Sequence, residues 1–403
     1  MRILVLAGGS DQIALIKELK SRGHYVLLVD YFENPPAKQY ADFHIIASTL
    51  DIERVKDIAI ENRVNLICTA CTDQALLSVA KASEDLSLPC YISYRTALNV
   101  TNKSYMKKVM MDFNIPTSRY VIVNRSDVID LQEFEYPLVI KPVDSNSSKG
   151  VKKVNNRKEL TIALENAISI SRTGNAIIEE FKIGEEISAD FYIENGEVKF
   201  LCATNSTKIK TRNSFTILQS CYPAISIEQE VQLVAIAQQI SLAFNLTNTP
   251  LLIQLILNDN QFSVLEFSAR MGGGSKYKLI EVLSGVNIME KYVDLILGNS
   301  PIITPTRRIG FAAMNYVYCS QGVLDSVKGL QEMYNSSLID CYFLYKTRGM
   351  EFTKSETSSD RVAGYLVTAS NRQELSDKIS YIDANLAVID KNGVDIMLHG
   401  LIQ

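Results

Sequence analysis

The chain has 403 residues, of which 47% are hydrophobic and 21% are charged. This composition is typical of a globular protein, and the length allows two to three domains at roughly 150 residues each. The 41 lysine and arginine residues against 45 aspartate and glutamate residues leave a formal net charge of −4. That balance argues against a general binder of nucleic acid or of an anionic membrane, although it permits a local basic pocket for phosphates. The three histidines, His24, His44 and His399, are too scattered for a metal site built from histidine.

No segment of the sequence approaches the run of roughly 20 apolar residues that a membrane-spanning helix needs. The first residues carry no cationic start and no cleavage pattern, so we expect no signal peptide. The seven cysteines are odd in number and widely spread, which fits reduced thiols and predicts a cytoplasmic protein. Cys68 and Cys71 form one CxxC pair without a second pair. We interpret them as buried structural thiols, with a redox or metal role as the alternative.

The first 101 residues alternate short apolar runs with amphipathic stretches. We predict strands at residues 3–7, 25–30 and 66–69 and helices at residues 12–22, 52–61 and 74–82. Strands that are apolar throughout and are separated by helices indicate a parallel sheet covered on both faces. Residues 1–101 are therefore predicted to form a doubly wound α/β domain.

The turn after the first strand contains Gly8 and Gly9, and Asp30 ends the second strand. A dinucleotide fingerprint needs G-x-G-x-x-G, and the third glycine is missing here. A tight strand-to-helix turn is the plainest interpretation. A turn whose amides bind a carboxylate or phosphate, and a turn that binds NAD, remain as alternatives.

From Asn102 onward the pattern of elements changes. We predict helices at residues 103–112, 227–243, 276–297 and 372–382, and strands at residues 119–123, 137–142, 150–154, 176–181, 251–257, 261–267 and 361–368. The economical division is a middle domain at residues 102–300, with a mobile lobe at about residues 117–186, and an α+β domain at residues 301–403.

The first chemical signal is the run YPLVIKPVDSNSSKGV at residues 136–151. Lys141 lies near the end of a predicted strand, and a serine-rich turn then closes on Gly150 before the next strand. A triphosphate needs a compact cation on a rigid element and a loop whose backbone amides can point inward. The Walker A pattern is absent, and an ordinary polar hairpin with a surface lysine is the alternative.

The second signal is the acidic run IIEEFKIGEEI at residues 177–187. A solvated edge of a sheet would explain it. The functional alternative is a hinge strand whose backbone and Glu179 read an adenine edge, while Glu186, beyond the turn at Gly184, binds ribose hydroxyls.

The third signal is a pair of polar residues inside apolar strands, Gln254 in LLIQLIL (residues 251–257) and Glu266 in FSVLEFSARMGGGS (residues 262–275). We expect these strands to pair as a hairpin through residues 258–260. An acid and an amide inside such strands are costly unless they are satisfied, and paired oxygen ligands suit Mg²⁺. Arg270 offers a planar fork for phosphoryl or carboxylate oxygens, and the glycines at 272–274 can bring amides close to a substrate. A satisfied polar cluster at the strand ends is the alternative.

In this order and spacing, the segments resemble the ATP-grasp superfamily of carboxylate–amine and carboxylate–thiol ligases over essentially the whole chain. Glutamine at position 254 looks most like the carbamoyl-phosphate synthetase large subunit, and the tail at residues 359–365 is similar to biotin carboxylase and purine-biosynthesis members. The resemblance implies a doubly wound preATP-grasp domain, an ATP-grasp domain that clamps ATP between two lobes, and a small β-rich C-terminal domain.

The resemblance also implies roles for individual residues. The nucleotide-binding residues would be Lys103, Lys141, Ser147, Ser148, Lys149, Gly150, Glu179, Glu180, Phe181, Lys182 and Glu186. The ligands of Mg²⁺ or Mn²⁺ would be Gln254, Glu266 and Ser268. Lys141, Lys210 and Arg270 would carry the chemistry, with Lys210 near the γ-phosphate.

Two features depart from the family pattern. Ser268 stands where relatives usually have asparagine in a Glu-x-Asn-Pro-Arg run, which leaves open whether one or two metal ions bind. The turn at Gly8 lacks the Gly-Arg-Glu-His-Ala start of glycinamide ribonucleotide synthetases, which weakens a purine assignment.

The reaction implied is ATP-dependent: a small carboxylate attacks the γ-phosphate to give an acyl phosphate, and an amine then attacks its carbonyl, with release of ADP and phosphate. A purine-biosynthesis enzyme, either phosphoribosylglycinamide synthetase-like or aminoimidazole-carboxylating, is one alternative. A nucleotide-binding protein that has lost catalysis is another, and an oxidoreductase is the most remote. We expect small-molecule substrates, no nucleic acid, no membrane and, as relatives suggest, a homodimer. The sequence does not identify the acid or the amine, although we expect the front domain, residues 272–278 and Arg361 to contact them.

Overall fold

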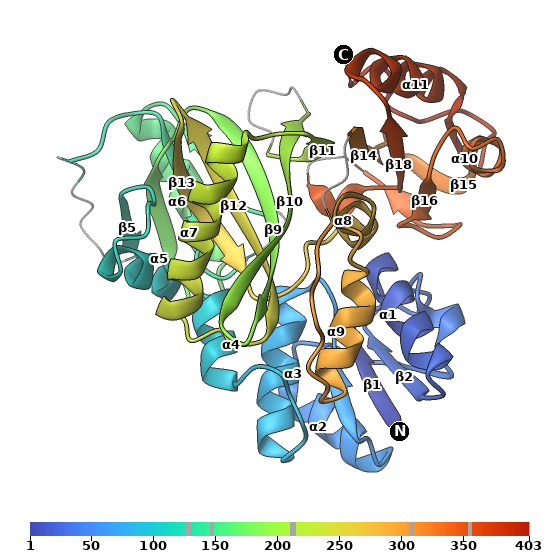
Figure 1. The fold of residues 1–403 in the computed structure, drawn as a ribbon, viewed down its shortest axis with the longest axis horizontal. Helices are drawn as coiled ribbons and strands as arrows, with labels where there is room; N and C mark the ends of the chain where they lie inside the picture. The colour runs from blue at the N-terminus through green and yellow to red at the C-terminus, as the bar shows by residue number, and fades with distance from the viewer. Residues whose placement is uncertain are drawn as a thin grey trace.

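The computed structural model describes residues 1–125, 131, 133–145, 149–209, 215–306, 310–353 and 357–402. The strands of these residues form four sheets. In Figure 1, the front region (residues 1–101) is drawn in blue at the bottom, a pair of lobes lies at the upper left, and the region near the C-terminus lies at the upper right. Ser147, Ser148 and Lys210 lie outside the described residues. In the part of the chain that is described, no helix has the length and apolar character needed to cross a membrane.

The front sheet is parallel, as predicted, with the order β3-β2-β1-β4. Its strands are β1 (Arg2–Leu6), β2 (Tyr25–Asp30), β3 (Phe43–Ile46) and β4 (Leu66–Cys68), and its helices are α1 (Ser10–Ser21), α2 (Ile52–Glu61) and α3 (Asp73–Asp85). Alternate residues of β1 pack on opposite faces, since Ile3 joins the core cluster of α1 and Leu4 joins that of α2 and α3. The sequence did not predict β3, whose Phe43 and Ile46 are both exposed on the edge of the sheet.

The small sheet is antiparallel and has the order β5-β8-β6-β7. Its strands are β5 (Tyr120–Val123), β6 (Leu138–Pro142), β7 (Lys152–Val154) and β8 (Ala176–Glu180), all at predicted positions. Helix α6 (Arg157–Ile170), which was not predicted, packs its Leu160 and Leu164 against Leu138 and Ile178 of the sheet.

The large sheet has eight strands in the order β13-β12-β9-β10-β11-β14-β18-β16. They are β13 (Gln261–Ser268), β12 (Thr249–Asn258), β9 (Glu185–Glu194), β10 (Glu197–Lys208), β11 (Ile217–Tyr222), β14 (Phe311–Val317), β18 (Ala363–Ala369) and β16 (Cys341–Leu344). Helix α7 (Ile227–Ala243), at its predicted position, contributes Leu233 and Ile240 to the core beside β9 and β12. This sheet joins strands from both sides of residue 301, so the predicted domain boundary there stays a prediction.

The C-terminal region adds a three-stranded sheet of β15 (Gly322–Lys328), β17 (Glu351–Phe352) and β19 (Ala387–Asp390). Helices α10 (Leu330–Asn335) and α11 (Arg372–Asn385) accompany it, and Figure 1 draws this region in orange and red.

The single helix predicted for residues 276–297 is wrong. The structure has α8 (Lys276–Ser284) and α9 (Ile288–Ile296), separated by Gly285 at φ +71°. A glycine in this left-handed conformation ends a helix, and a Cβ here would lie 2.5 Å from the Thr306 hydroxyl oxygen. The Asn287 side chain then accepts a hydrogen bond from the Glu290 amide and starts α9.

Two short helices connect the front region to the lobes. They are α4 (Tyr94–Thr101) and α5 (Lys103–Asp112), and α5 has its predicted bounds. The Asn102 side chain caps α5 by accepting from the Ser104 and Tyr105 amides. The Lys103 amide donates to the Val143 carbonyl at 3.0 Å, which holds the start of α5 beside the end of β6.

Candidate active site

Gln254 and Glu266 are cross-strand partners in the β12–β13 hairpin. The hairpin turns through Asp259 and Asn260, whose φ angles of 46° and 62° suit a tight turn. The predicted pairing of these two strands is therefore confirmed. Ser268, two residues beyond Glu266, lies on the same face of β13 because side chains alternate along a strand.

Two cavities meet at this pair of residues. The inter-sheet cavity is lined from the small sheet by Val139, Lys141, Val151, Glu179 and Glu180, and from the large sheet by Glu186, Lys208, Ile256 and Leu265. The front cavity is lined by Asp73, Ser268, Arg270, Lys276, Tyr316 and Arg361. Lys103, Ser145, Gln254 and Glu266 line both cavities, so a ligand in one can reach a ligand in the other at this point.

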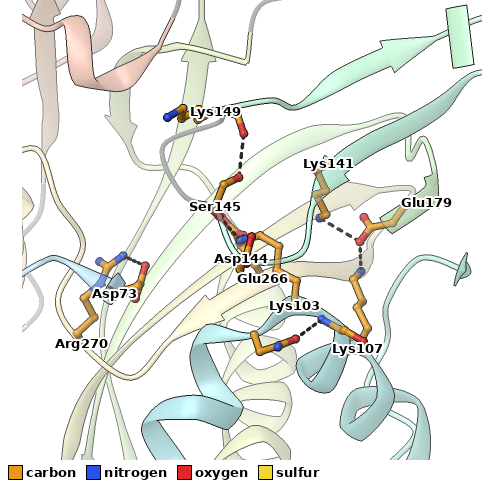
Figure 2. Close-up of polar contacts among 12 residues, drawn as sticks. Asp73, Lys103, Lys107, Lys141, Asp144, Ser145, Lys149, Glu179, Glu266 and Arg270 are labelled. Carbon is orange, nitrogen blue, oxygen red and sulfur yellow. Dashed lines mark hydrogen bonds and ion pairs between the residues drawn. The ribbon is translucent and has the colours of Figure 1, made fainter. Parts of the chain in front are cut away.

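Nearby lysines stabilise the ionised form of the Glu266 carboxylate. The Lys103 ammonium lies 3.2 Å from a Glu266 carboxylate oxygen and also donates to the Ser145 carbonyl at 2.7 Å (Figure 2). Burial alone would raise the pKa of Glu266, but the ammonium groups of Lys103 and Lys141 outweigh burial and lower that pKa to about 2. The carboxylate is therefore ionised at any physiological pH.

Glu179 is shared by two lysines. The Lys141 ammonium lies 3.0 Å and the Lys107 ammonium 3.4 Å from the same carboxylate oxygen of Glu179, as Figure 2 shows. Burial opposes ionisation of Glu179, but both lysines outweigh it and lower the pKa of the carboxyl group. Because this carboxylate is occupied by the two ammonium groups, the predicted contact of Glu179 with adenine stays a prediction.

The segment that follows β8 forms one end of the inter-sheet cavity. Glu180 forms ion pairs with Arg119 and with Lys182, the second at 2.9 Å. The Lys153 ammonium lies 3.8 Å from the centre of the Phe181 ring. Glu186 of β9 also lines this cavity and pairs with Lys208 of β10.

The loop between β6 and β7 lies beside the Lys103–Glu266 pair. The Ser145 hydroxyl donates to the Lys149 carbonyl at 2.8 Å, which draws the two ends of the loop together (Figure 2). Gly150 then leads into β7. The predicted contacts of Lys149 and Gly150 with phosphate stay predictions.

Arg270 was predicted to present its guanidinium fork to a ligand. Instead, its Nε donates to Asp73 at 2.7 Å and one terminal nitrogen pairs with the other oxygen of the same carboxylate (Figure 2). Its remaining terminal nitrogen donates to the Met271 carbonyl at 2.6 Å. The fork therefore joins β13 to the start of α3, and a direct role in chemistry stays a prediction.

The glycine run after β13 is bound by an acid of the front region. The Asp11 carboxylate accepts from the amides of Gly274, at 3.1 Å, and Ser275, at 2.7 Å. We expected the amides of this segment to bind a substrate, but here both donate to the Asp11 carboxylate. Gly274 has φ +75°, and a Cβ at this position would lie 2.4 Å from the Arg361 guanidinium, so the close approach requires glycine.

Arg361 differs from the other cations of the front cavity. Lys276 pairs with Asp190 at 3.2 Å, whereas the Arg361 guanidinium lies 3.6 Å from the centre of the Tyr316 ring and donates to the Tyr318 hydroxyl at 3.2 Å. Within the described ranges, its close contacts are thus aromatic rather than carboxylate. A partly buried guanidinium held in this way is suited to a carboxylate or phosphoryl ligand.

The cysteines show no sign of a metal centre. Cys68 is buried at the end of β4, and burial raises the pKa of both the Cys68 and Cys71 thiols. Among the residues that the structure describes, no three histidine, cysteine, aspartate or glutamate side chains are grouped to hold a metal ion. Of the predicted ligands Gln254, Glu266 and Ser268, only Glu266 is of these residue types, so the oxygen site stays a prediction.

Three residues of this site were missed from the sequence. Lys107 lies four positions after Lys103, so the predicted helix would have placed both lysines on one face. Asp11 and Asp73 stand in the first turns of α1 and α3, where acids are common for local reasons and signal no distant partner.

The sequence of this chain is similar to those of known proteins. Residues 134–278 match a family model described as the ATP-grasp domain. A formate-dependent phosphoribosylglycinamide formyltransferase of Prochlorococcus marinus subsp. pastoris is 29% identical over 185 residues, which cover 45% of this chain and 47% of that protein. The chain thus spans about half the length of that relative.

Two further comparisons extend over more of the chain. A phosphoribosylamine–glycine ligase of Methanococcoides burtonii is 23% identical over 304 residues, 70% of each chain. The crystal structure of an L-amino acid ligase from Bacillus licheniformis superposes with a TM-score of 0.79 at 21% identity, over 97% of this chain and 99% of that one.

The fold and the two cavities define a protein with two lobes facing each other across a charged cleft. Residues 134–278 therefore match the ATP-grasp domain, the family that the sequence motifs predicted.

Proposed function

We propose that the chain is an ATP-dependent ligase that converts a small carboxylate into an acyl phosphate and joins it to an amine, with release of ADP and phosphate. The observation that carries this proposal is that Gln254 and Glu266 stand where the two cavities meet. A nucleotide in the inter-sheet cavity and a carboxylate in the front cavity would meet at these two residues.

The inter-sheet cavity suits a nucleoside triphosphate. Its apolar walls of Val139 and Val151 on one sheet and Ile256 and Leu265 on the other fit a flat base. Glu186, which lines this cavity, is the residue proposed to accept hydrogen bonds from ribose hydroxyls. Lys141 and Lys103 line the part of this cavity nearer the junction. Their positive charges would attract and neutralise the negative charges of the phosphates there.

The residues at the junction fit a divalent cation of the hard, oxygen-binding type. Glu266 is ionised, and the Gln254 amide oxygen lies across from it on the partner strand. These two residues, and Ser268 on the same face, would hold Mg²⁺ or Mn²⁺. When bound, the cation would neutralise charge on the transferring phosphoryl group.

The chemistry then requires mainly positioning. A carboxylate oxygen attacks the γ-phosphorus while the bond to the β-phosphate oxygen breaks, and ADP leaves. An amine nitrogen next attacks the carbonyl carbon, loses a proton, and phosphate leaves. Arg361, held by Tyr316 and Tyr318, is the residue proposed to bind the carboxylate, whereas Arg270 is placed to fix the wall of the cavity.

The relatives suggest which substrates to test first. The L-amino acid ligase supports an amino acid as the carboxylate. The formyltransferase and the glycine ligase act, by name, on phosphoribosyl compounds, which supports a purine-pathway substrate as the second candidate. Reduced cysteines and the use of ATP support a cytoplasmic location, and a homodimer is the proposed assembly.

A coupled assay of ADP release tests the proposal. The purified protein is incubated with MgATP and a panel of amino acids, small carboxylates, bicarbonate and phosphoribosyl amines. ADP release that depends on a carboxylate and an amine together supports the ligase. Release that needs a phosphoribosyl amine favours the purine-pathway candidate, and ATP binding with no release across the panel favours a protein that has lost catalysis.

A further inference from the structure

Lys107 is a charged residue with no role in the proposed reaction, yet its side chain is only 1% exposed. Its ammonium donates to the Thr117 hydroxyl at 2.6 Å and lies 3.4 Å from the Glu179 carboxylate. Thr117 in turn donates to the Val264 carbonyl of β13 at 2.7 Å. A lysine is seldom buried to this degree without a reason, because removing an ammonium group from water is energetically costly.

The charges of the cluster of lysines and glutamates that includes Lys107 do not balance. Lys103, Lys107 and Lys141 supply three positive charges, while Glu179 and Glu266 supply two negative ones. The Lys141–Glu179 contact would be a neutral pair on its own. With Lys107 on the same carboxylate oxygen, Glu179 cannot fully neutralise Lys141, and a positive potential remains where the phosphates are proposed to bind.

We propose that Lys107 is a positioning residue of the nucleotide site: by sharing the Glu179 carboxylate, it leaves Lys141 positive toward the phosphates, and nucleotide affinity falls when Lys107 is neutral. This inference rests on the proposed function of the inter-sheet cavity and adds a residue, and a pH dependence, to it.

The surroundings of Lys107 support a change of charge in an accessible pH range. Burial is the largest influence and, together with Lys141 on β6, outweighs the attraction of Glu179 on β8 and Glu266 on β13, so that the pKa of Lys107 falls to about 8. Tyr120 on β5 also faces Glu179, but burial raises its pKa, which leaves it neutral in this range. Lys103 stays charged because Glu266 raises its pKa despite burial.

The experiment measures the dissociation constant of MgADP by direct titration from pH 7 to pH 9.5, without any acid or amine substrate. For the unaltered protein we expect the affinity to fall by about five- to tenfold through an inflection near pH 8. For Lys107→Met we expect the weaker affinity at all these pH values and no inflection. Lys108→Met, a change at the neighbouring residue whose side chain is 71% exposed, is the matched control and should behave as the unaltered protein.

A second variant separates an electrostatic role from mere packing. Thr117→Val removes the oxygen that accepts from Lys107 while keeping the shape of the side chain, so the neutral amine is favoured and the inflection should move to lower pH. If Lys107→Met does not fold, the pH dependence of MgADP affinity in Thr117→Val alone tests the role of Lys107. An unchanged inflection in Thr117→Val, or the same pH profile in Lys107→Met as in the unaltered protein, overturns the role of Lys107. Failure of the unaltered protein to bind any nucleotide would instead overturn the proposed function.

Discussion

Arg270, two residues beyond the end of β13, and Asp73, at the start of α3, form a two-point ion pair although 197 positions separate them in the sequence. The side chains are 14% and 19% exposed. The strand that carries Glu266 is therefore fastened directly to the front region, and the front cavity lies between them. This pair makes the position of the proposed metal site depend on the docking of the front region.

The first prediction concerns this pair. Arg270→Met or Asp73→Leu alone should lower the free energy of unfolding by about 3 kcal/mol, because each leaves a largely buried charge without its partner. The double variant should recover most of the loss, since neither charge remains. Urea unfolding of all four proteins gives the coupling energy. If the double variant loses the sum of the two single losses in free energy of unfolding, the two side chains do not interact.

The second prediction concerns the pH dependence of stability. The folded-state pKa of Glu266, about 2, lies below the ordinary value of 4.5. The carboxylate therefore adds stability above about pH 4.5, and this contribution is lost as the pH falls toward 2. The difference in free energy of unfolding between the unaltered protein and Glu266→Gln should shrink between pH 6 and pH 3.5. Glu197→Gln, at an exposed carboxylate of β10, is the control, and a difference that does not change with pH would contradict the ion pair with Lys103.

The third prediction concerns Lys141. Lys141→Met should weaken MgADP binding by about tenfold or more, since an ammonium at the phosphates is removed and Glu179 keeps only Lys107. Lys152→Met, at an exposed lysine on the neighbouring strand β7, is the matched control. If the two variants bind MgADP with equal affinity in a direct titration, Lys141 does not contribute to nucleotide binding.

The fourth prediction concerns Arg361. Once a carboxylate substrate is known, Arg361→Met should raise its KM by about 10- to 100-fold, which is the range for loss of a charged hydrogen-bond pair, and leave MgADP affinity unchanged. Arg348→Met, at an arginine whose side chain is 81% exposed, is the control. A parallel loss of nucleotide affinity in Arg361→Met would show that the residue acts on the fold rather than on the carboxylate.

Much of the site could be predicted because its signals are local. Gln254 and Glu266 stand out as polar residues in apolar strands, and a short turn between the strands fixes them as neighbours. Lys141 and the helix that begins at Lys103 are equally visible from short-range patterns.

What could not be predicted depends on contacts between distant segments. Nothing near Asp11 or Asp73 indicates that each binds the chain more than 190 residues later, at Ser275 and Arg270. The break at Gly285 was hidden because apolar periodicity continues through it into α9. The sequence around Lys107 gives no sign of its role, since its burial arises only when the small sheet closes over α5.

The central claim is that Gln254 and Glu266 hold a divalent cation between the two cavities, and Mn²⁺ binding measured by electron paramagnetic resonance in the presence of a non-hydrolysable ATP analogue tests it most directly. We expect tight binding by the unaltered protein and by Glu197→Gln, and a loss of about tenfold or more in affinity in Glu266→Gln and, to a smaller degree, in Gln254→Leu. Equal Mn²⁺ affinity in the unaltered protein and in folded Glu266→Gln would contradict the claim.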